Sequence, residues 1–358
     1  MAEPAPGRRS DEAELREWHR QKRELFDQFG EQLAKLIKVA LRQDAIQFQE
    51  VFSRTKGEKS FLDKAQRYDD PRSEINDLVG LRVITYFTGE IDRVERKLSG
   101  LFAVDPSLTK DKANDLGRDR LGYRARHFVC AIGPDRELLD DWKSFRDIRF
   151  EVQVTTVLGH AWAEFEHDRG YKSPGQLPPE LERRLNLAAG LLEVADRELD
   201  WLAGEISNYT IEIAQEIGRG DEALSQIDLN AISLRELLLE RLPLSVKSGA
   251  LQTEYNNPEA SDLAVSELRA FGVRTLDDVA SLIPSSYDQR HAAILSGNTL
   301  LGVTRDLMMI ADAPRYFEEA WRKSWHGWHP DSLVLLRKYG VDTAGLQKEH
   351  GLFIEDDG

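Results

Sequence analysis

Residues 147–155 read Asp-Ile-Arg-Phe-Glu-Val-Gln-Val-Thr, an alternation of apolar and polar side chains. Successive side chains of a β-strand point to opposite faces of the sheet, so the stretch predicts a strand. The apolar face would carry Ile148, Phe150, Val152 and Val154, and the polar face Arg149, Glu151, Gln153 and Thr155. A chain with such a strand needs a sheet that buries one face and leaves the other charged.

Further helices and strands are predicted around this strand. Residues 12–42 carry apolar side chains at helical spacing and no proline, which predicts one long amphipathic helix or two. Two other stretches, 46–52 and 81–87, predict strands, and residues 89–102 predict a helix. Residues 156–167 predict a helix with a buried stripe of Leu158, Ala161, Trp162 and Phe165.

The second half of the chain is predicted to be wholly helical. It contains a weak repeat, because residues 268–279 resemble residues 336–346. In each copy a helix ends at a glycine (Gly272, Gly340), and a threonine (Thr275, Thr343) can cap the next helix. The predicted fold class is α+β, a mixed β-sheet flanked by helices with an all-α C-terminal domain.

The predicted organisation has four parts. They are a disordered lead with an amphipathic helix (1–45), a mixed α/β domain (46–175), a long helical segment (176–219) and a helical accessory domain (220–358). A chain of 358 residues is long enough for two cores, because single cores rarely exceed about 250–300 residues.

Composition excludes several classes of protein. The net charge of −15 argues against non-specific binding of duplex DNA, which needs a basic surface. No stretch approaches the ~18 apolar residues of a membrane span, and the first residues lack the apolar core of a signal peptide. The single cysteine, Cys130, excludes an intramolecular disulfide and a cysteine zinc cluster, and favours a reducing compartment. We therefore expect a cytoplasmic protein with neither membrane nor duplex DNA as its partner.

Residues that can carry chemistry lie in four short segments between residues 54 and 154. They read RTKGEKSFLDK (54–64), NDLVGLRV (76–83), RLGYRARHFV (120–129) and FEVQV (150–154). The first holds Arg54, Lys56, Ser60 and Lys64, the second Asp77 and Arg82, the third Arg120, Tyr123 and His127, and the fourth Glu151, with Arg118 just upstream of the third.

These residue types suit a nucleotide. Several separated cations suit a polyphosphate, because charge-assisted hydrogen bonds to phosphate are strong. Two isolated carboxylates, Asp77 and Glu151, suit Mg²⁺, which is held by one or two carboxylates together with substrate phosphates. An exposed tyrosine can stack on a base, a contact worth about 1–3 kcal/mol. The sequence has no G-x-x-x-x-G-K-[ST] loop and no H-R-D segment, so side chains would have to carry out phosphoryl chemistry.

In order and spacing, these four segments, with HAWAEFEHDRGYK (160–172), resemble the synthetase domain of the RelA/SpoT family of (p)ppGpp synthetases. The resemblance covers about residues 46–172. It implies a nucleotidyltransferase-like fold and transfer of pyrophosphate from ATP to the 3′-hydroxyl of GDP or GTP, with Mg²⁺. It also implies a homo-oligomer, because small members of the family assemble through the helices that follow the domain.

The resemblance also implies roles for individual residues. Arg54 and Arg82 would sandwich the adenine of ATP. Its phosphates would be held by Lys56, Ser60, Lys64 and Lys112. Mg²⁺ would be bound by Asp77 and Glu151, and Glu151 would help to deprotonate the attacking hydroxyl. The acceptor would be bound by four residues: Tyr123 would stack on its base, His127 would contact its phosphate, and Arg118 and Arg120 would add positive charge.

The sequence departs from the family pattern near the acceptor. Thr155 stands where family members commonly have arginine, and Leu121 where they have asparagine. Two alternatives therefore stay open: a relative that modifies another acceptor, such as the 3′ end of tRNA or an adenosine nucleotide, and a nucleotide-sensing module without turnover. The family's hydrolase needs a metal-binding His-Asp motif before the synthetase domain. That region holds one histidine, His19, so no hydrolase activity is expected.

Three histidine and glutamate side chains are candidate metal ligands by residue type. His160, Glu164 and His167 share one face of the predicted helix 156–167, but their spacing is not that of a zinc-protease helix. We expect that helix to support the site instead. The segment SWHGWH (324–329) is expected to be a packed helix end, with base or partner binding as the alternative.

Overall fold

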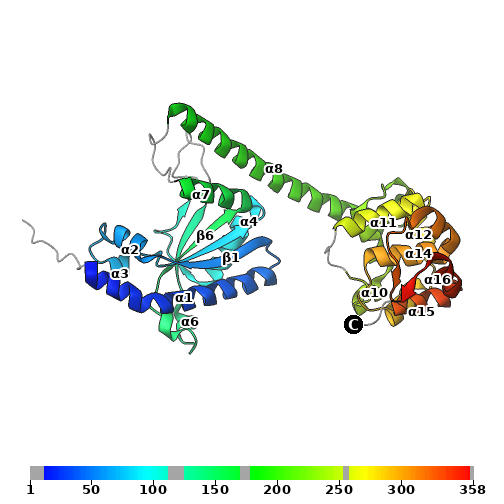
Figure 1. Cartoon of the computed structure of the whole chain (residues 1–358), viewed down its shortest axis with the longest axis horizontal. Helices are drawn as coiled ribbons and strands as arrows, with labels where there is room; N and C mark the ends of the chain where they lie inside the picture. Colours follow the sequence, from blue (N-terminus) through cyan, green and yellow to red (C-terminus); the bar gives the residue numbers. More distant parts are fainter. Residues whose placement is uncertain (1–11, 112–124, 170–177, 253–257, 355–358) are drawn as a thin grey trace, which may run out of the picture. The chain divides into compact units, whose positions relative to one another are not determined.

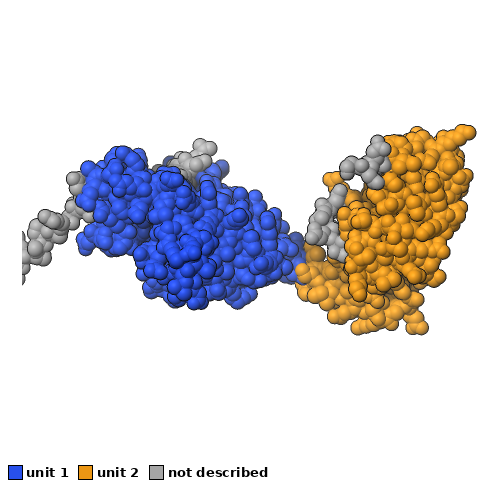
Figure 2. Space-filling model, turned by 90° about the horizontal axis from the view of Figure 1, so that it is seen from below, with its two compact units in different colours: residues 1–204 blue, residues 205–358 orange. Residues whose placement is uncertain are grey.

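The computed structural model describes residues 12–111, 125–169, 178–252 and 258–354. The chain divides into two compact units, Met1–Gly204 and Glu205–Gly358 (Figure 2). The division falls inside α8 (Pro179–Gly218), a 40-residue helix. This helix covers most of the predicted helical segment 176–219.

A mixed sheet forms the centre of unit 1 (Figure 1). Its strand order is β1-β2-β6-β5-β3, and β4 pairs with β5 beside this path. The strands are β1 (Phe48–Thr55), β2 (Val79–Thr85), β3 (Ala103–Val104), β4 (Lys110–Asp111), β5 (Arg126–Ala131) and β6 (Phe150–Thr156). β2 and β6 are parallel, and the other pairs are antiparallel. The predicted mixed sheet flanked by helices is therefore confirmed.

Helices flank this sheet in unit 1. They are α1 (Glu12–Gln43), α2 (Glu58–Ala65), α3 (Pro71–Glu74), α4 (Thr88–Leu101), α6 (Pro134–Glu137), the 3₁₀ turn η1 (Lys143–Phe145) and α7 (Val157–Arg169). Phe29 of α1 and Val94 of α4 are fully buried in one cluster with Phe150 and Val152. The predicted alternation of β6 therefore places its apolar residues in the core, while Glu151 and Gln153 stay partly exposed on the other face.

One prediction about α7 is wrong. Of the four side chains expected to form its buried stripe, Trp162 is buried, Leu158 is half-buried, and Ala161 and Phe165 are exposed. α7 is anchored to the sheet partly through polar side chains, because His160 and Glu164 contact Arg82 of β2. The prediction of an apolar stripe assumes that a helix contacts its sheet only through apolar side chains, and α7 does not.

Unit 2 is built from helices around its own apolar core. Its elements are η2 (Asp221–Gln226), α9 (Ala231–Arg241), α10 (Pro243–Ser248), α11 (Pro258–Ala270), α12 (Leu276–Leu282), α13 (Tyr287–Ile294), α14 (Leu300–Arg315), the π-helical turn η3 (Tyr316–Ala320), α15 (Pro330–Lys338) and α16 (Thr343–His350). The expectation of a wholly helical tail needs one correction, because β7 (Gly327–Trp328) and β8 (Phe353–Ile354) pair in parallel.

The internal repeat forms two similar helix pairs, α11–α12 and α15–α16. Gly272 and Gly340 have φ angles of +94° and +82°, a region that favours glycine, and each follows the end of a helix. Thr275 caps α12 as predicted, accepting a hydrogen bond from the backbone N of Asp278. The second predicted cap is wrong: Asp342 caps α16, and the Thr343 hydroxyl accepts a hydrogen bond from Arg337.

Two further expectations concern unit 2 and the membrane. The segment 324–329 packs on the core, because Trp328 is buried there and Trp321 donates its indole N–H to the carbonyl oxygen of Trp325. It is not the expected helix end, since the helical turn before it ends at Ala320 and Gly327–Trp328 form β7. In the described residues, none of the helices is both long and apolar enough to span a bilayer.

Candidate functional site

The polar face of the sheet brings together residues from four strands. In the register of β1, β2 and β6, Arg54 lies opposite Gly80, and Gly80 lies opposite Glu151. Gly80 has no side chain, so the row has a gap between the guanidinium of Arg54 and the carboxylate of Glu151. Among the described residues, the exposed Arg54 side chain makes no hydrogen bond or ion pair. Arg54 and Glu151 therefore lie on either side of Gly80 in the same row of the polar face.

Asp77 lies two residues before β2 and carries two lysine partners. Lys56 Nζ is 2.7 Å from Asp77 Oδ2, and Lys64 Nζ is 3.0 Å from Asp77 Oδ1. The Asp77 side chain is 22% exposed, so both ion pairs are partly shielded from water. Lys64 also acts electrostatically on Glu151. The positive charge of Lys64 therefore acts on both carboxylates predicted to form the magnesium site.

The backbone around Lys56 is fixed by hydrogen bonds. Its N–H donates to the carbonyl oxygen of Leu78, and its own carbonyl oxygen lies 2.8 Å from His19 Nε2. His19 is 1% exposed and stacks on Phe61 of α2, with ring centroids 5.0 Å apart. The lone histidine of the first helix therefore supports the lysine segment from the core.

Glu151 is held by two side chains of the same face. His127 Nδ1 lies 3.0 Å from Glu151 Oε1, and Gln153 donates to the same oxygen at 2.7 Å. Burial raises the pKa of Glu151, but the hydrogen bonds from His127 and Gln153 and the positive charges of His127 and Lys64 outweigh it and lower the pKa to about 2. The carboxylate is therefore fully ionised at neutral pH.

Arg82 is fixed in place by residues of α7. Its Nη1 lies 2.9 Å from His160 Nδ1 and also donates to Glu164 Oε1. The guanidinium carbon is 5.8 Å from the centroid of Phe52, the residue opposite Arg82 on β1. Burial and the charge of Arg82 both lower the pKa of His160, so the neutral ring can accept this hydrogen bond.

The remaining predicted site residues are placed as follows. Ser60 is exposed on α2, four residues before Lys64 and so on the same side of the helix. Lys112, Arg118, Arg120 and Tyr123 lie outside the described residues. His127 is 9% exposed and faces the polar side, whereas Arg126 contacts Asp92 and Glu95 of α4 on the opposite side, as the alternation predicts.

Four residues that hold this site were not predicted to do so: Gln153, His160, Glu164 and Phe52. Gln153 stood on the predicted polar face and could have been identified two residues after Glu151. His160 and Glu164 were weighed as metal ligands, whereas in the structure they hold Arg82; the side chain of His167 lies outside the described residues. Phe52 is apolar and therefore was not a candidate site residue. The register of β1 on β2 places it opposite Arg82, whose guanidinium lies over its ring.

Thr155, where the family commonly has arginine, is 3% exposed. It lies opposite Ile84 of β2, and its carbonyl oxygen accepts a hydrogen bond from the Thr85 hydroxyl. The neighbouring Thr156 donates its hydroxyl to Asp196 of α8 at 2.7 Å. The end of β6 is therefore a packed junction with α8.

Comparison with known proteins identifies the domain that carries this site. Residues 53–176 match the family model described as the region found in RelA/SpoT proteins. This segment is a RelA/SpoT domain. Arg54, Asp77, Arg82, His127 and Glu151 all lie inside it.

Two curated relatives of the RelA/SpoT domain are enzymes of Bacillus subtilis. GTP pyrophosphokinase YjbM is 29% identical over 160 residues, which covers 44% of this chain and 72% of the relative. GTP pyrophosphokinase YwaC is 23% identical over 165 residues, covering 43% and 73%. A solved structure of small alarmone synthetase 1 from Bacillus subtilis aligns with a TM-score of 0.45 at 25% identity, over 54% of this chain and 98% of that one.

Proposed function

We propose that the chain is a pyrophosphokinase that transfers pyrophosphate from ATP to the 3′-hydroxyl of GDP or GTP and so makes (p)ppGpp. The observation that carries the proposal is the position of Lys64, which contacts Asp77 and whose charge also lowers the pKa of Glu151. The RelA/SpoT domain and its relatives named GTP pyrophosphokinase support the same reaction. A cytoplasmic location and a homo-oligomer are parts of this proposal.

The ATP half of the proposed site uses the base-stacking and cationic residues. Arg54 and Arg82 would hold the adenine between their guanidinium planes, and Glu164 and His160 would keep Arg82 in orientation. A guanidinium already paired with a carboxylate still offers its flat face to a base. Lys56, Ser60 and Lys64 would bind the phosphates, with the two lysines exchanging Asp77 for phosphate oxygens.

The residues present fit a magnesium ion. Asp77 and Glu151 are carboxylates, and Glu151 is ionised at neutral pH. Asp77 contacts both lysines that would bind ATP phosphates, and the charge of Lys64 also acts on Glu151. One or two carboxylates together with phosphate oxygens are the usual ligands of Mg²⁺ in such sites. When bound, Mg²⁺ would neutralise charge that builds up on the phosphates.

In the proposed reaction the 3′-oxygen of the acceptor forms a bond to the β-phosphorus of ATP. The bond from that phosphorus to the oxygen bridging the α and β positions breaks, AMP leaves, and the hydroxyl proton passes to solvent. Such transfers depend mainly on positioning and on neutralising charge. Glu151 would hold Mg²⁺ and would help to pass the hydroxyl proton to solvent.

The acceptor half of the site rests on His127 and on residues outside the described ones. His127 supports Glu151 and lies on β5, the strand that follows the segment with Tyr123. Tyr123 would stack on the acceptor base, and Arg118, Arg120 and Lys112 would bind phosphates. Among the described residues, nothing favours tRNA or an adenosine nucleotide over GDP or GTP.

Product analysis by mass spectrometry tests this proposal. The purified chain is incubated with ATP, Mg²⁺ and GDP, GTP, ADP or bulk tRNA in turn. We expect GDP and GTP to gain one pyrophosphate and AMP to appear in equal amount. Asp77→Asn and Glu151→Gln should each lower the rate at least about a hundredfold, whereas Glu31→Gln, an exposed carboxylate of α1, should not.

The outcomes separate the alternatives. A pyrophosphorylated tRNA or ADP instead of GDP or GTP would show a different acceptor. Tight nucleotide binding without any product would identify a sensing module. Full activity in both Asp77→Asn and Glu151→Gln would contradict the roles assigned here.

A further inference from the structure

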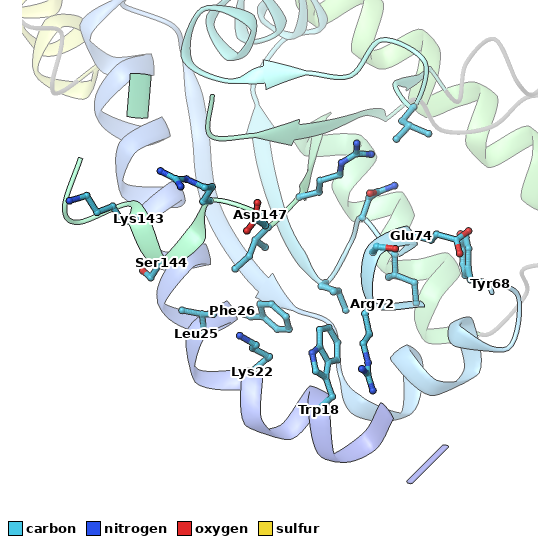
Figure 3. A pocket seen from close by; sticks show the side chains of 18 residues that line it. Trp18, Lys22, Leu25, Phe26, Tyr68, Arg72, Glu74, Lys143, Ser144 and Asp147 are labelled. Atoms are coloured by element: carbon cyan, nitrogen blue, oxygen red, sulfur yellow. The ribbon is translucent and has the colours of Figure 1, made fainter. Parts of the chain in front are cut away.

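Unit 1 contains a recess whose lining includes none of the residues assigned to the proposed reaction. It is a cavity of about 740 Å³ lined by α1, by the stretch from Tyr68 to Leu78 and by the turn that precedes β6 (Figure 3). This volume is in the range of small-molecule sites. Arg54, Asp77, Arg82 and Glu151 are not among its lining residues. The cavity therefore reaches the two neighbours of Asp77, Asn76 and Leu78, but is lined by none of these four residues.

The floor of this cavity is apolar. Phe26, Ile75 and Leu78 line it and are at most 4% exposed, and the half-buried Trp18 and Ile148 extend it. Trp18 also packs edge-on against Phe26, with ring centroids 5.9 Å apart. An apolar floor with aromatic side chains favours a flat ring as its occupant.

Two polar atoms in the lining are buried without a partner. Asn76 Oδ1 and Arg72 Nε have no hydrogen bond among the described residues. A buried polar atom that lacks a partner costs free energy, so each such atom calls for a ligand or water. Asn76 offers an acceptor to an N–H group, and Arg72 offers a donor to an oxygen.

The rim of the cavity supplies positive charge. Five cationic and two acidic side chains line it: Lys22, Arg72, Lys143, Arg146 and Arg149, against Glu74 and Asp147. Four of the cations contact acidic residues outside the lining, in pairs with Glu14, Asp140, Glu137 and Asp105. Lys22 has no such partner among the described residues. Because exposed ion pairs are weak, an incoming anion can compete for these cations, and Lys22 is available at once.

We propose that this cavity binds a small flat ring compound that carries an anionic group and an N–H donor. The ring lies on Phe26, Ile75 and Leu78, and the anion contacts Lys22 and Arg72. The N–H group donates to Asn76 Oδ1. Because none of the residues assigned to pyrophosphate transfer lines the cavity, this inference stands independently of the proposed function.

Fluorescence titration with 5-aminonaphthalene-1-sulfonate tests the proposal, since this probe has a flat ring, an amino group and an anion. The full chain should bind it saturably. Lys22 is exposed on α1. Lys22→Glu should weaken binding at least about tenfold, because it replaces a cationic donor by a carboxylate that repels the sulfonate of the probe. Lys35→Glu, exposed on the same helix but outside the cavity, is the matched control and should bind as the unchanged chain does.

A second comparison tests the hydrogen bond to Asn76. Naphthalene-1-sulfonate lacks the amino group and should bind more weakly than the amino probe. Asn76→Ala should abolish that difference while leaving the binding of naphthalene-1-sulfonate unchanged. Non-saturable binding, equal affinity in Lys22→Glu, or loss of binding in Arg54→Ala, which belongs to the polar face, would overturn the proposal.

Discussion

His127 Nδ1 lies 3.0 Å from Glu151 Oε1 and joins two neighbouring strands, β5 and β6, across the polar face. Against the effect of burial, this contact, Gln153 and Lys64 lower the pKa of Glu151 from 4.5 to about 2. A carboxylate with a lowered pKa stabilises the fold above its unfolded pKa, and that stabilisation is lost as pH falls through the folded pKa.

The first prediction concerns the pH dependence of stability in Glu151→Gln. At pH 7 the variant should unfold with a free energy about 2–3 kcal/mol below that of the unchanged chain. The difference should shrink as pH falls from about 5 to about 2, because Glu151 becomes protonated in both the folded and the unfolded state. Urea unfolding at a series of pH values measures it. A difference that stays constant over this range would show that the carboxylate is not held ionised.

The second prediction concerns the contact between Arg82 and α7, and it rests on the proposed function. In Glu164→Gln the guanidinium of Arg82 loses its carboxylate partner, which is 52% exposed. Because half-exposed ion pairs contribute up to about 1 kcal/mol, KM for ATP should rise up to about fivefold with little change in kcat. His160→Ala should have a similar effect.

Steady-state kinetics at varied ATP and fixed acceptor measures this effect. Ala161→Gln, at an exposed position on the same helix, is the control and should leave both constants unchanged. A fall in kcat with KM unaltered in Glu164→Gln would show that Glu164 acts on the transfer step and does not position Arg82.

The third prediction concerns Mg²⁺. Removal of the ion with a chelator should abolish product formation, and the activity should return when Mg²⁺ is restored. Asp77→Asn keeps a side-chain oxygen but loses the charge, so it should need a higher Mg²⁺ concentration for half-maximal activity. Titration of activity against Mg²⁺ at fixed ATP measures the shift. An unchanged Mg²⁺ requirement in Asp77→Asn would place the ion elsewhere.

Much of the fold of unit 1 could be predicted from local patterns. The alternation in residues 147–155 identified β6 and its two faces, because period two is a property of each strand alone. The order of the strands in the sheet could not be predicted in this way. β2 and β6 are parallel partners about 70 residues apart in sequence, and such a pairing depends on the packing of the whole sheet.

The same distinction separates the site residues that could be predicted from those that could not. Asp77 and Glu151 were identified from their residue type, their position at strands and the family resemblance. The contacts of His127 with Glu151 and of Arg82 with His160 cross between elements, so no local pattern contains them. The wrong stripe on α7 has the same origin, since the polar side chains His160 and Glu164 face Arg82.

The last prediction concerns the core of unit 2. Glu267 of α11 is 1% exposed and forms a two-point contact with Arg305 of α14, at 2.8 and 2.7 Å. The hydroxyls of Tyr316 and Ser324 also donate to its carboxylate. Removal of one partner from a buried ion pair leaves the other charge without compensation, so Glu267→Ala should lower the free energy of unfolding by about 3–5 kcal/mol.

Chemical denaturation of the full chain, followed by tryptophan fluorescence, measures this loss, because Trp321, Trp325 and Trp328 lie in or against the same core. Glu259→Ala removes an exposed carboxylate from the same helix and should change stability by less than about 0.5 kcal/mol. The double variant Glu267→Ala with Arg305→Met should recover part of the stability, because it also removes the charge left without a partner. Equal stability of Glu267→Ala and Glu259→Ala would contradict a buried ion pair at this position.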